Sequence, residues 1–281
     1  MKNIEIIDKE FKCLNYGFVR LVDYMGDDAA IVQAARTSYG QGTKTTSEDR
    51  ALIRYLMRQK HTSPFEMVEF KFHIKLPIFI ARQWIRHRTA NVNEYSGRYS
   101  EMRDEFYLPE PEVIKNQSND NKQGRSEEIL PANYTNEIIN NFASLQENAY
   151  KEYKKVVDAG LAREIARINL PLSIYTEWYW KIDLHNLFHF LRLRMDKHSQ
   201  YEIRVYANII ADILKVCVPL AFEAFEDYQL NSFSLSKAEQ KVLSKLISDV
   251  KIEEMSEDFF AECGLGKREI NEFKEKIKRI M

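Results

Sequence analysis

The stretch Val68-Glu69-Phe70-Lys71-Phe72-His73-Ile74-Lys75-Leu76-Pro77 alternates apolar and polar side chains up to its final proline. Because successive side chains of a strand point to opposite faces of a sheet, this period of two predicts a strand with one buried face. The same alternation returns over residues 174–182, where Trp178 and Trp180 share a face with Ile174 and Ile182. Two half-buried strands that lie far apart in the sequence predict a sheet with one apolar face.

Helices are predicted between and after these strands. A strand over residues 17–25 leads to an alanine-rich helix over 29–36, and a second helix is expected over 47–59. Pro77 suits the first position of a helix that runs from residue 78 to about 88. In the C-terminal half, helices are expected over residues 142–159, 162–169, 183–195 and 198 to about 225.

Two segments depart from the globular pattern. Residues 110–136 are rich in Asn, Gln, Ser, Lys and Glu and are expected to form a surface loop. Beyond residue 230 the chain is charged and helix-prone, with an amphipathic stripe that includes Leu243 and Leu246. We therefore expect one domain over residues 1–230 with a loop insertion at 110–136, followed by a charged helical extension over 231–281.

Composition restricts the class of protein. The 281 residues are 44% hydrophobic, which is enough for a large core, and 41 Lys and Arg against 42 Asp and Glu leave a net charge of -1. Such a charge does not favour non-specific binding of nucleic acid. Cys13, Cys217 and Cys263 lack the spacing of a zinc site or a disulfide framework, and no apolar run reaches membrane-spanning length. We expect a cytoplasmic protein that binds neither nucleic acid nor membranes.

Chemically distinctive residues gather in the run RHRTANVNEYSGRYS, residues 86–100. Gln83, Arg86 and His87 are expected to share one face of the preceding helix, because they are spaced i, i+3, i+4. Further along, Ser96-Gly97-Arg98 combines a hydroxyl group, close backbone approach and a fixed charge. These groups together predict a loop that binds an anion with a flat, polar edge.

A second cationic cluster lies in the C-terminal half. Two of its members, His185 and His189, could share a metal ion, but there is no HExxH pattern and Asp183 is the only acid close by, so no metal site is expected. Local hydrogen bonds on a half-buried helix are the alternative for both histidines. Arginines beside apolar residues need a counter-charge, which an internal carboxylate, Glu94 or a ligand could supply. The cluster comprises Arg163, Arg167, His185, His189, Arg192, Arg194 and His198.

The order Arg86-His87-Arg88, seven intervening residues, then Ser96 resembles the signature of the flavin-dependent thymidylate synthases. The resemblance extends over most of residues 17–228, and the run departs from the family pattern at Asn91, where serine is usual. It is carried also by HTSPFEM (61–67), PIFIARQWIRHR (77–88), REIARINLPLSIYT (163–176) and LHNLFHFLRLRMDKHSQYEI (184–203).

This resemblance implies an α+β fold in which a twisted, mainly antiparallel sheet packs against long helices. It also implies an active site that is shared between subunits of a homotetramer. The implied reaction converts dUMP to dTMP for dTTP biosynthesis. Its one-carbon unit comes from 5,10-methylenetetrahydrofolate, and its hydride comes from FAD that NADPH has reduced.

Site residues follow from the same resemblance. Arg194 would be the catalytic residue, since a guanidinium against the pyrimidine edge stabilises the anion formed when N3 of uracil ionises. FAD would contact Ser63, Arg86, His87, Arg88, Glu94, Asp183, His185 and His189, with His61 near the flavin. The dUMP site would contain Gln83, Arg86, Glu94, Tyr95, Ser96, Gly97, Arg98, Arg167 and Arg194.

Two other classes of protein compete with this interpretation. One is a nucleic-acid-binding module that uses Arg and Tyr side chains, against which the near-neutral charge counts. The other is a metal-dependent hydrolase built on His185 and His189. A bound flavin would separate the synthase from both.

Overall fold

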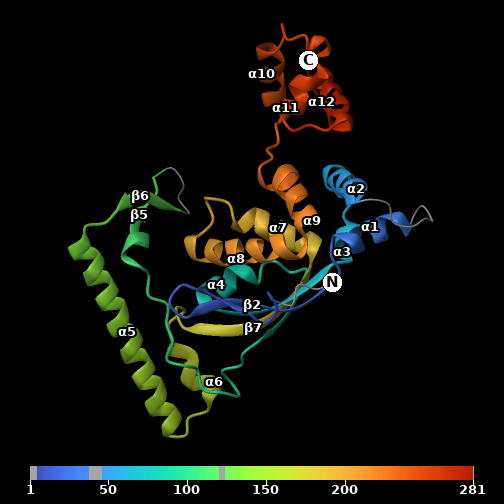
Figure 1. Ribbon diagram of the computed structural model, residues 1–281. Helices are drawn as coiled ribbons and strands as arrows, with labels where there is room; N and C mark the ends of the chain where they lie inside the picture. The colour runs from blue at the N-terminus through green and yellow to red at the C-terminus, as the bar shows by residue number, and fades with distance from the viewer. Residues whose placement is uncertain (1–4, 38–45, 120–123, 281) are drawn as a thin grey trace. The chain divides into compact units, whose positions relative to one another are not determined.

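The computed structural model describes residues 5–37, 46–119 and 124–280. The chain divides into two compact units, Met1–Leu230 and Asn231–Met281. All residues predicted to act on a ligand belong to the first unit, which also carries the sheets (Figure 1). In the described part of the chain, no helix is both long enough and apolar enough to span a membrane.

A sheet of five strands in the order β1-β2-β3-β7-β4 forms the centre of the first unit. Each neighbouring pair is antiparallel. Together with the helices packed on it, this sheet confirms the α+β class with a mainly antiparallel sheet. The strands are β1 (Glu10–Cys13), β2 (Gly17–Met25), β3 (Glu69–Pro77), β4 (Asn91–Glu94) and β7 (Tyr175–Asp183).

The two alternating stretches become the adjacent strands β3 and β7. Their register places Phe72 opposite Trp180 and Ile74 opposite Trp178, so the apolar positions of both strands face the same side. All four side chains are buried. Removing each from water contributes roughly 1.5–3 kcal/mol, so this face contributes strongly to the stability of the fold.

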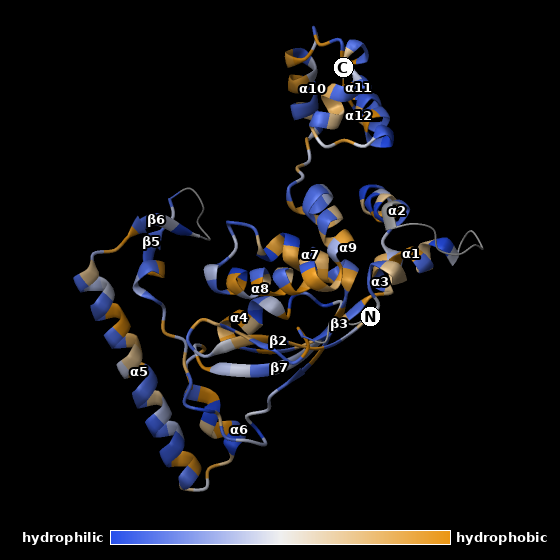
Figure 2. Ribbon diagram, viewed as in Figure 1, coloured by the Kyte–Doolittle hydropathy of each residue, from blue (hydrophilic) through white to orange (hydrophobic). Residues whose placement is uncertain are grey.

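Helices α4 (Ile78–Trp84), α7 (Leu184–Arg194) and α8 (Tyr201–Cys217) cover that apolar face (Figure 1). Trp84, the last residue of α4, stacks on Phe190 of α7 with ring centroids 4.6 Å apart and meets Trp180 edge-on at 5.1 Å. Hydrophobic and hydrophilic residues alternate along α7 and α8, as expected for helices with one buried face (Figure 2). The Trp84 contacts hold the end of α4 against α7.

The opposite side of the sheet carries α6 (Arg163–Ala166) and the 3-10 turn η3 (Arg167–Asn169) (Figure 1). A smaller hydrophobic cluster of Met102, Phe106, Tyr153, Ala166 and Ile174 packs there, with Tyr95 against it. The long helix α5 (Ala132–Asp158) supplies Tyr153. The remaining elements of this unit are α1 (Asp28–Arg36), α2 (Thr46–Arg58), α3 (Ser63–Glu66), α9 (Pro219–Phe225) and the π-helical turn η4 (Glu226–Leu230).

Several predicted boundaries are wrong. The helix expected over residues 78–88 ends at Trp84, so Arg86 and His87 lie in the turn after it and share no helix face with Gln83. Part of the loop predicted within residues 86–100 is a strand, because Asn91–Glu94 form β4 and pair with β7. Tertiary pairing with an exposed sheet edge overrides the turn preference of asparagine there.

The insertion also differs from the loop expected over residues 110–136. Its described part contains the 3-10 turn η2 (Pro111–Val113), a two-stranded hairpin of β5 (Lys115–Gln117) and β6 (Arg125–Ile129), and the start of α5. Helix α5 therefore begins ten residues before the expected position, at Ala132. The helix expected from residue 198 to about 225 is two helices, because Pro219 has no N–H to donate.

The second unit is helical in its described part. It contains α10 (Lys237–Leu246), the 3-10 turn η5 (Ile252–Glu254), α11 (Glu257–Glu262) and α12 (Lys267–Ile280). Ile252, Phe260 and Ile270 form its small core. Ser236 and Glu239 begin α10 with a capping box, in which each side chain accepts from the other residue's backbone N–H.

Candidate active site

The turn after α4 presents three consecutive cationic or imidazole side chains. Arg86 and Arg88 are exposed, whereas His87 is half-buried against α7. Its ring meets Phe190 edge-on, with centroids 4.9 Å apart. Because Trp84 is anchored in the aromatic core, the chain leaves α4 beside α7, and His87 reaches His189 and Arg194, two members of the second cationic cluster that lie on α7.

Arg194 and His87 form a direct hydrogen bond. The Nε–H of Arg194 donates to Nε2 of His87 at 3.0 Å, so this imidazole carries its proton on Nδ1 and is neutral. Burial, followed by the charge of Arg194 and by His189, lowers the pKa of His87 to about 4. A neutral acceptor thus orients the Arg194 guanidinium and leaves both of its Nη groups to a ligand.

Helix α7, which carries Arg194, brings further basic side chains close to His87. His189 lies beside His87, with ring centroids 6.1 Å apart, and burial, Arg192 and His185 lower its pKa. Among the described residues, no ion pair joins Arg192 or Arg194 to a carboxylate. We call His87, His189 and Arg194 the imidazole group. Its uncompensated positive charge suits an anionic ligand.

The side chains that could bind FAD here are guanidinium and imidazole groups. Arg86 and Arg88, like Arg192, make no ion pair within the described ranges, and guanidinium groups suit a diphosphate. Neutral imidazoles can bond to the polar atoms of a flavin ring. Across the same described residues, no three His, Cys, Asp or Glu side chains form a group able to hold a metal ion.

Three other predicted FAD residues lie around α7. The short helix α3, which begins at Ser63, packs against α7, and the ring of His61 lies 5.9 Å from that of Tyr55. Asp183 caps α7: its Oδ1 accepts from the backbone N–H of Asn186 at 2.9 Å, and its Oδ2 accepts from the amide side chain at 2.8 Å. Both oxygens of Asp183 thus have a structural role, and its contact with FAD stays a prediction.

Residues 95–100 form a tight turn that we call the Gly97 loop. The carbonyl oxygen of Ser96 accepts from the backbone N–H groups of Tyr99 and Ser100, each at 3.1 Å. Its hydroxyl oxygen accepts from the N–H of Arg98 at 3.3 Å. A hydroxyl group and a guanidinium therefore project from one turn.

Gly97 is packed against Arg167. A Cβ at Gly97 would lie 2.8 Å from Sδ of Met102 and 3.2 Å from Cδ of Arg167, so any larger residue there would force these side chains to shift. Arg98 pairs with Glu164 of α6 at 3.1 Å, although both side chains are more than half exposed, at 59% and 52%. The fold thus brings Gly97, Arg98 and Arg167 together, and their binding of an anion stays a prediction.

Glu94 and Gln83 lie on the helix-covered side. Glu94 stands opposite Trp178 in the register, and its Oε1 accepts from the hydroxyl of Thr176 at 2.8 Å. Gln83 donates from Nε2 to Oε1 of Gln200. Thr176 and Gln200 were not among the predicted site residues. The alternating pattern marks Thr176 only as a core position, and nothing in the sequence pairs Gln200 with Gln83.

The predicted residues therefore form two groups within one chain. The imidazole group lies at α4 and α7, whereas the Gly97 loop packs on α6 and η3, which lie on the other side of the sheet (Figure 1). The first group suits a flat ring with a polar edge, and the second suits a phosphate.

Known proteins share this sequence and fold. A family model described as "Thymidylate synthase complementing protein" matches residues 20–220. The flavin-dependent thymidylate synthase of Treponema denticola is 56% identical over 97% of this chain and 98% of its own length. That of Wolbachia pipientis wMel is 57% identical over 95% of this chain and 92% of its own.

A solved structure agrees with these relatives. The crystal structure of the UMP/dUMP methylase PolB from Streptomyces cacaoi, bound with 5-Br dUMP, superposes with a TM-score of 0.72 at 33% identity. It covers 78% of this chain and 99% of PolB. From the family model, the identities and this superposition, we conclude that the chain belongs to the flavin-dependent thymidylate synthases.

Proposed function

We propose that this protein converts dUMP to dTMP by reductive methylation. The one-carbon unit comes from 5,10-methylenetetrahydrofolate. FAD, reduced by NADPH, supplies the hydride when bound. The relatives with this activity match nearly the whole chain, and PolB, which acts on UMP and dUMP, shares its fold.

The single observation that carries the proposal is the Arg194 guanidinium, held by neutral His87 and free of carboxylate partners among the described residues. Placed at the pyrimidine edge, it stabilises negative charge at N3 and thereby makes C5 of uracil more nucleophilic. Cys13 and Cys217 are poor candidates for a thiolate nucleophile, because burial raises the pKa of each to about 12, and Cys263 belongs to the second unit, apart from the predicted site residues. We therefore assign the activation of uracil to the positive charge of Arg194 and not to a cysteine thiolate.

The other proposed contacts with dUMP and FAD divide between the Gly97 loop and the imidazole group. Ser96, the Gly97 backbone, Arg98 and Arg167 would hold the dUMP phosphate, a dianion, through charge-assisted hydrogen bonds. The nucleoside part would contact Gln83, Arg86, Glu94, Tyr95 and Arg194. The residues that would hold FAD are Ser63, Arg86, His87, Arg88, Glu94, Asp183, His185 and His189, with His61 near the ring.

We also propose that the enzyme is a homotetramer whose active sites combine two chains. The support is the separation of the imidazole group from the Gly97 loop by the sheet, since one dUMP molecule must meet both. Co-expression of Arg194→Ala with Arg98→Ala chains tests this. At a dUMP concentration that does not saturate Arg98→Ala, shared sites would raise the activity of the mixture above the sum of the two variants measured separately, whereas sites within one chain would give only that sum.

The proposal assigns residues 1–230 to catalysis and residues 231–281 to a helical extension. It places the reaction in the cytoplasm, in keeping with three free cysteines.

The absorption spectrum of the purified protein is the first test. The expected result is bound oxidised flavin, with dTMP formation that requires NADPH, dUMP and methylenetetrahydrofolate together. A colourless protein that FAD cannot reconstitute, or a flavoprotein that forms no dTMP, would overturn the proposal.

A further inference from the structure

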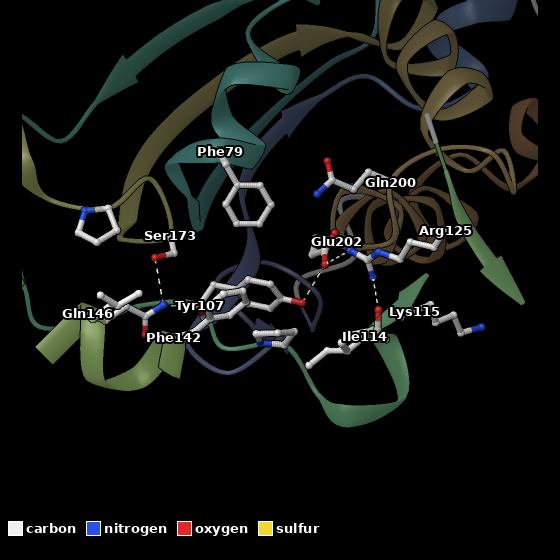
Figure 3. A pocket seen from close by; sticks show the side chains of 14 residues that line it. Phe79, Tyr107, Ile114, Lys115, Arg125, Phe142, Gln146, Ser173, Gln200 and Glu202 are labelled. Carbon is white, nitrogen blue, oxygen red and sulfur yellow. Dashed lines mark hydrogen bonds and ion pairs between the residues drawn. The ribbon is translucent and has the colours of Figure 1, made fainter. Parts of the chain in front are cut away.

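A cleft with two compartments lies between the insertion hairpin, helix α5 and the start of α8. Figure 3 shows the smaller compartment. The smaller compartment has a volume of about 500 Å³ and the larger about 840 Å³. They adjoin, because Lys115, Arg125 and Gln200 line both. We call this the hairpin cleft, and none of its polar groups has a role in the site described above except through Gln200.

The smaller compartment is mainly apolar, with a few amide and hydroxyl groups and, on the side of the hairpin, the charged Lys115, Arg125 and Glu202. Phe79, Tyr107 and Phe142 supply aromatic walls (Figure 3). Gln146 lies among them and donates from Nε2 to the hydroxyl oxygen of Ser173 at 3.1 Å. Such a lining suits a small flat ring that bears a carboxamide.

A buried ion pair holds the cleft together. The side chain of Glu202, at the start of α8, is 1% exposed and pairs with Nη2 of Arg125 at 2.5 Å. Its Oε1 also accepts from the hydroxyl of Tyr107 at 2.9 Å, while Oε2 is buried with no partner among the described residues. Breaking a pair of this kind is strongly destabilising, so Glu202 fixes the hairpin in place over α8.

The larger compartment collects positive charge from two separate elements. Lys115 and Arg125 come from the hairpin, Lys197 comes from the connection into α8, and Arg204 comes from α8 itself. Within the described chain, Lys197 makes no ion pair and Lys115 has only a distant one, 3.9 Å from fully exposed Glu127. Glu112 and Glu127 also line this compartment and Glu202 pairs with Arg125, so four Lys and Arg side chains face three carboxylates and one positive charge is in excess.

We propose that the hairpin cleft is the NADPH site, with the nicotinamide in the smaller compartment and the phosphates in the larger one. This inference rests on the proposed function, which requires NADPH but does not locate it. NADPH combines one small uncharged ring carrying a carboxamide with a large part that bears three phosphate groups. That division matches a small apolar compartment beside a larger cationic one.

Methylenetetrahydrofolate fits the cleft less well. Its pterin and aminobenzoyl rings make up most of the molecule, and its charge is confined to the glutamate end. The compartments have the opposite proportions, since the apolar one is the smaller. Charge and size therefore both favour the nicotinamide nucleotide.

The cleft also borders the proposed active site. Gln200 lines both compartments and accepts a hydrogen bond from Gln83 of α4. Arg86, His87 and Arg88, proposed to hold FAD, follow directly after that helix. A nucleotide in the cleft would thus lie along the helix that leads to the flavin residues.

The test is the reduction of bound FAD by NADPH, followed anaerobically by flavin absorbance in a stopped-flow instrument. The double variant Lys115→Ala/Lys197→Ala removes two cleft cations without touching the Glu202 pair. We expect the NADPH concentration for half-maximal rate to rise about tenfold or more, because two charge-assisted contacts are lost. The pair Lys151→Ala/Lys155→Ala on α5 is the matched control, and it should leave this concentration unchanged.

A second measurement separates this inference from the proposed function. When dithionite replaces NADPH as the reductant, the double variant should form dTMP in a single turnover at the wild-type rate. If wild-type protein forms none, the proposed function itself fails. If the variant's NADPH dependence is unchanged, or if only its KM for methylenetetrahydrofolate rises, the cleft is not the NADPH site.

Discussion

The imidazole group and the Gly97 loop keep positive charge available to a ligand in two different ways. Arg194 is partly buried, and a neutral histidine fixes its direction without cancelling its charge. Arg98 is more exposed and already paired with Glu164, while the turn around Gly97 sets its position. In the proposed site, a partly buried cation of fixed direction would meet the ring of dUMP, and exchangeable cations would meet its phosphate.

The energetic difference between the two groups follows from solvent. A charge in a partly buried place acts through a lower effective dielectric, so contacts of Arg194 are strong. An exposed ion pair such as Arg98 with Glu164 is worth only about 0.2–1 kcal/mol, and a dianionic phosphate can replace the carboxylate at little cost. Replacing residues in each group should therefore have unequal effects.

The largest effect is expected from Arg194→Ala. Loss of a preorganised donor to developing negative charge should lower kcat for dTMP formation by about 10²–10³ or more. The flavin spectrum should persist, because the proposed FAD residues other than His87 do not depend on Arg194. Arg82→Ala, an exposed position on α4, is the control. Near-normal methylation by Arg194→Ala would remove Arg194 as the activating residue.

Gly97→Ala should affect both stability and substrate binding. The added methyl group meets Met102 and Arg167, so we expect a loss of about 1–3 kcal/mol in unfolding free energy and a rise in KM for dUMP. Gly160→Ala is a contrasting variant, since Gly160 has a φ of +87° and nothing within 4 Å of its Cβ position. It should cost about 1 kcal/mol through the backbone alone and leave KM unchanged.

Arg98→Ala should weaken dUMP binding about tenfold, as expected for one charge-assisted hydrogen bond of at least 1.5 kcal/mol. Glu164→Gln removes the competing carboxylate and keeps Arg98, so it should leave dUMP affinity equal or slightly higher. Isothermal titration of both variants makes the comparison. Equal affinity in wild type and Arg98→Ala would contradict the phosphate role.

The smallest effect concerns His87 and pH. Its pKa is about 4 in the fold against an ordinary 6.5, so the unfolded chain binds a proton that the folded chain does not. The free energy of unfolding should therefore fall as the pH drops from 6.5 toward 4, by no more than about 1 kcal/mol for this half-exposed ring. Urea unfolding at two pH values measures it. The advantage of wild type over His87→Gln should shrink at the lower pH, and a constant advantage would contradict the assignment.

The alternating strands were predictable because their signal is local. Residues 17–25 form β2 as expected, and the stretches that became β3 and β7 shift by no more than one residue at each end. The ends of helices were harder to predict from the sequence. Nothing in the sequence of α4 indicates that it stops at Trp84, because packing of that tryptophan on Phe190 decides the exit.

Predictions of the site residues divide in the same way. The charge and turn chemistry of the Gly97 loop are visible in residues 95–100, since a hydroxyl, a glycine and an arginine adjoin there. The partners of those residues are not visible: Arg167 against Gly97, Gln200 with Gln83, and Arg125 with Glu202 are each separated by 70 residues or more.

By itself, the sequence determined the residue chemistry of this protein, its two half-buried strands and, through its motifs, its family. The tertiary structure alone decided that His87 is neutral beside Arg194, that the sheet separates the two groups, and that the insertion forms a cleft. The physical reason is the distance along the chain over which each effect acts. Side-chain alternation and turn preferences act between neighbours along the chain, whereas desolvation, ion pairing and close packing depend on atoms that only the folded chain brings together.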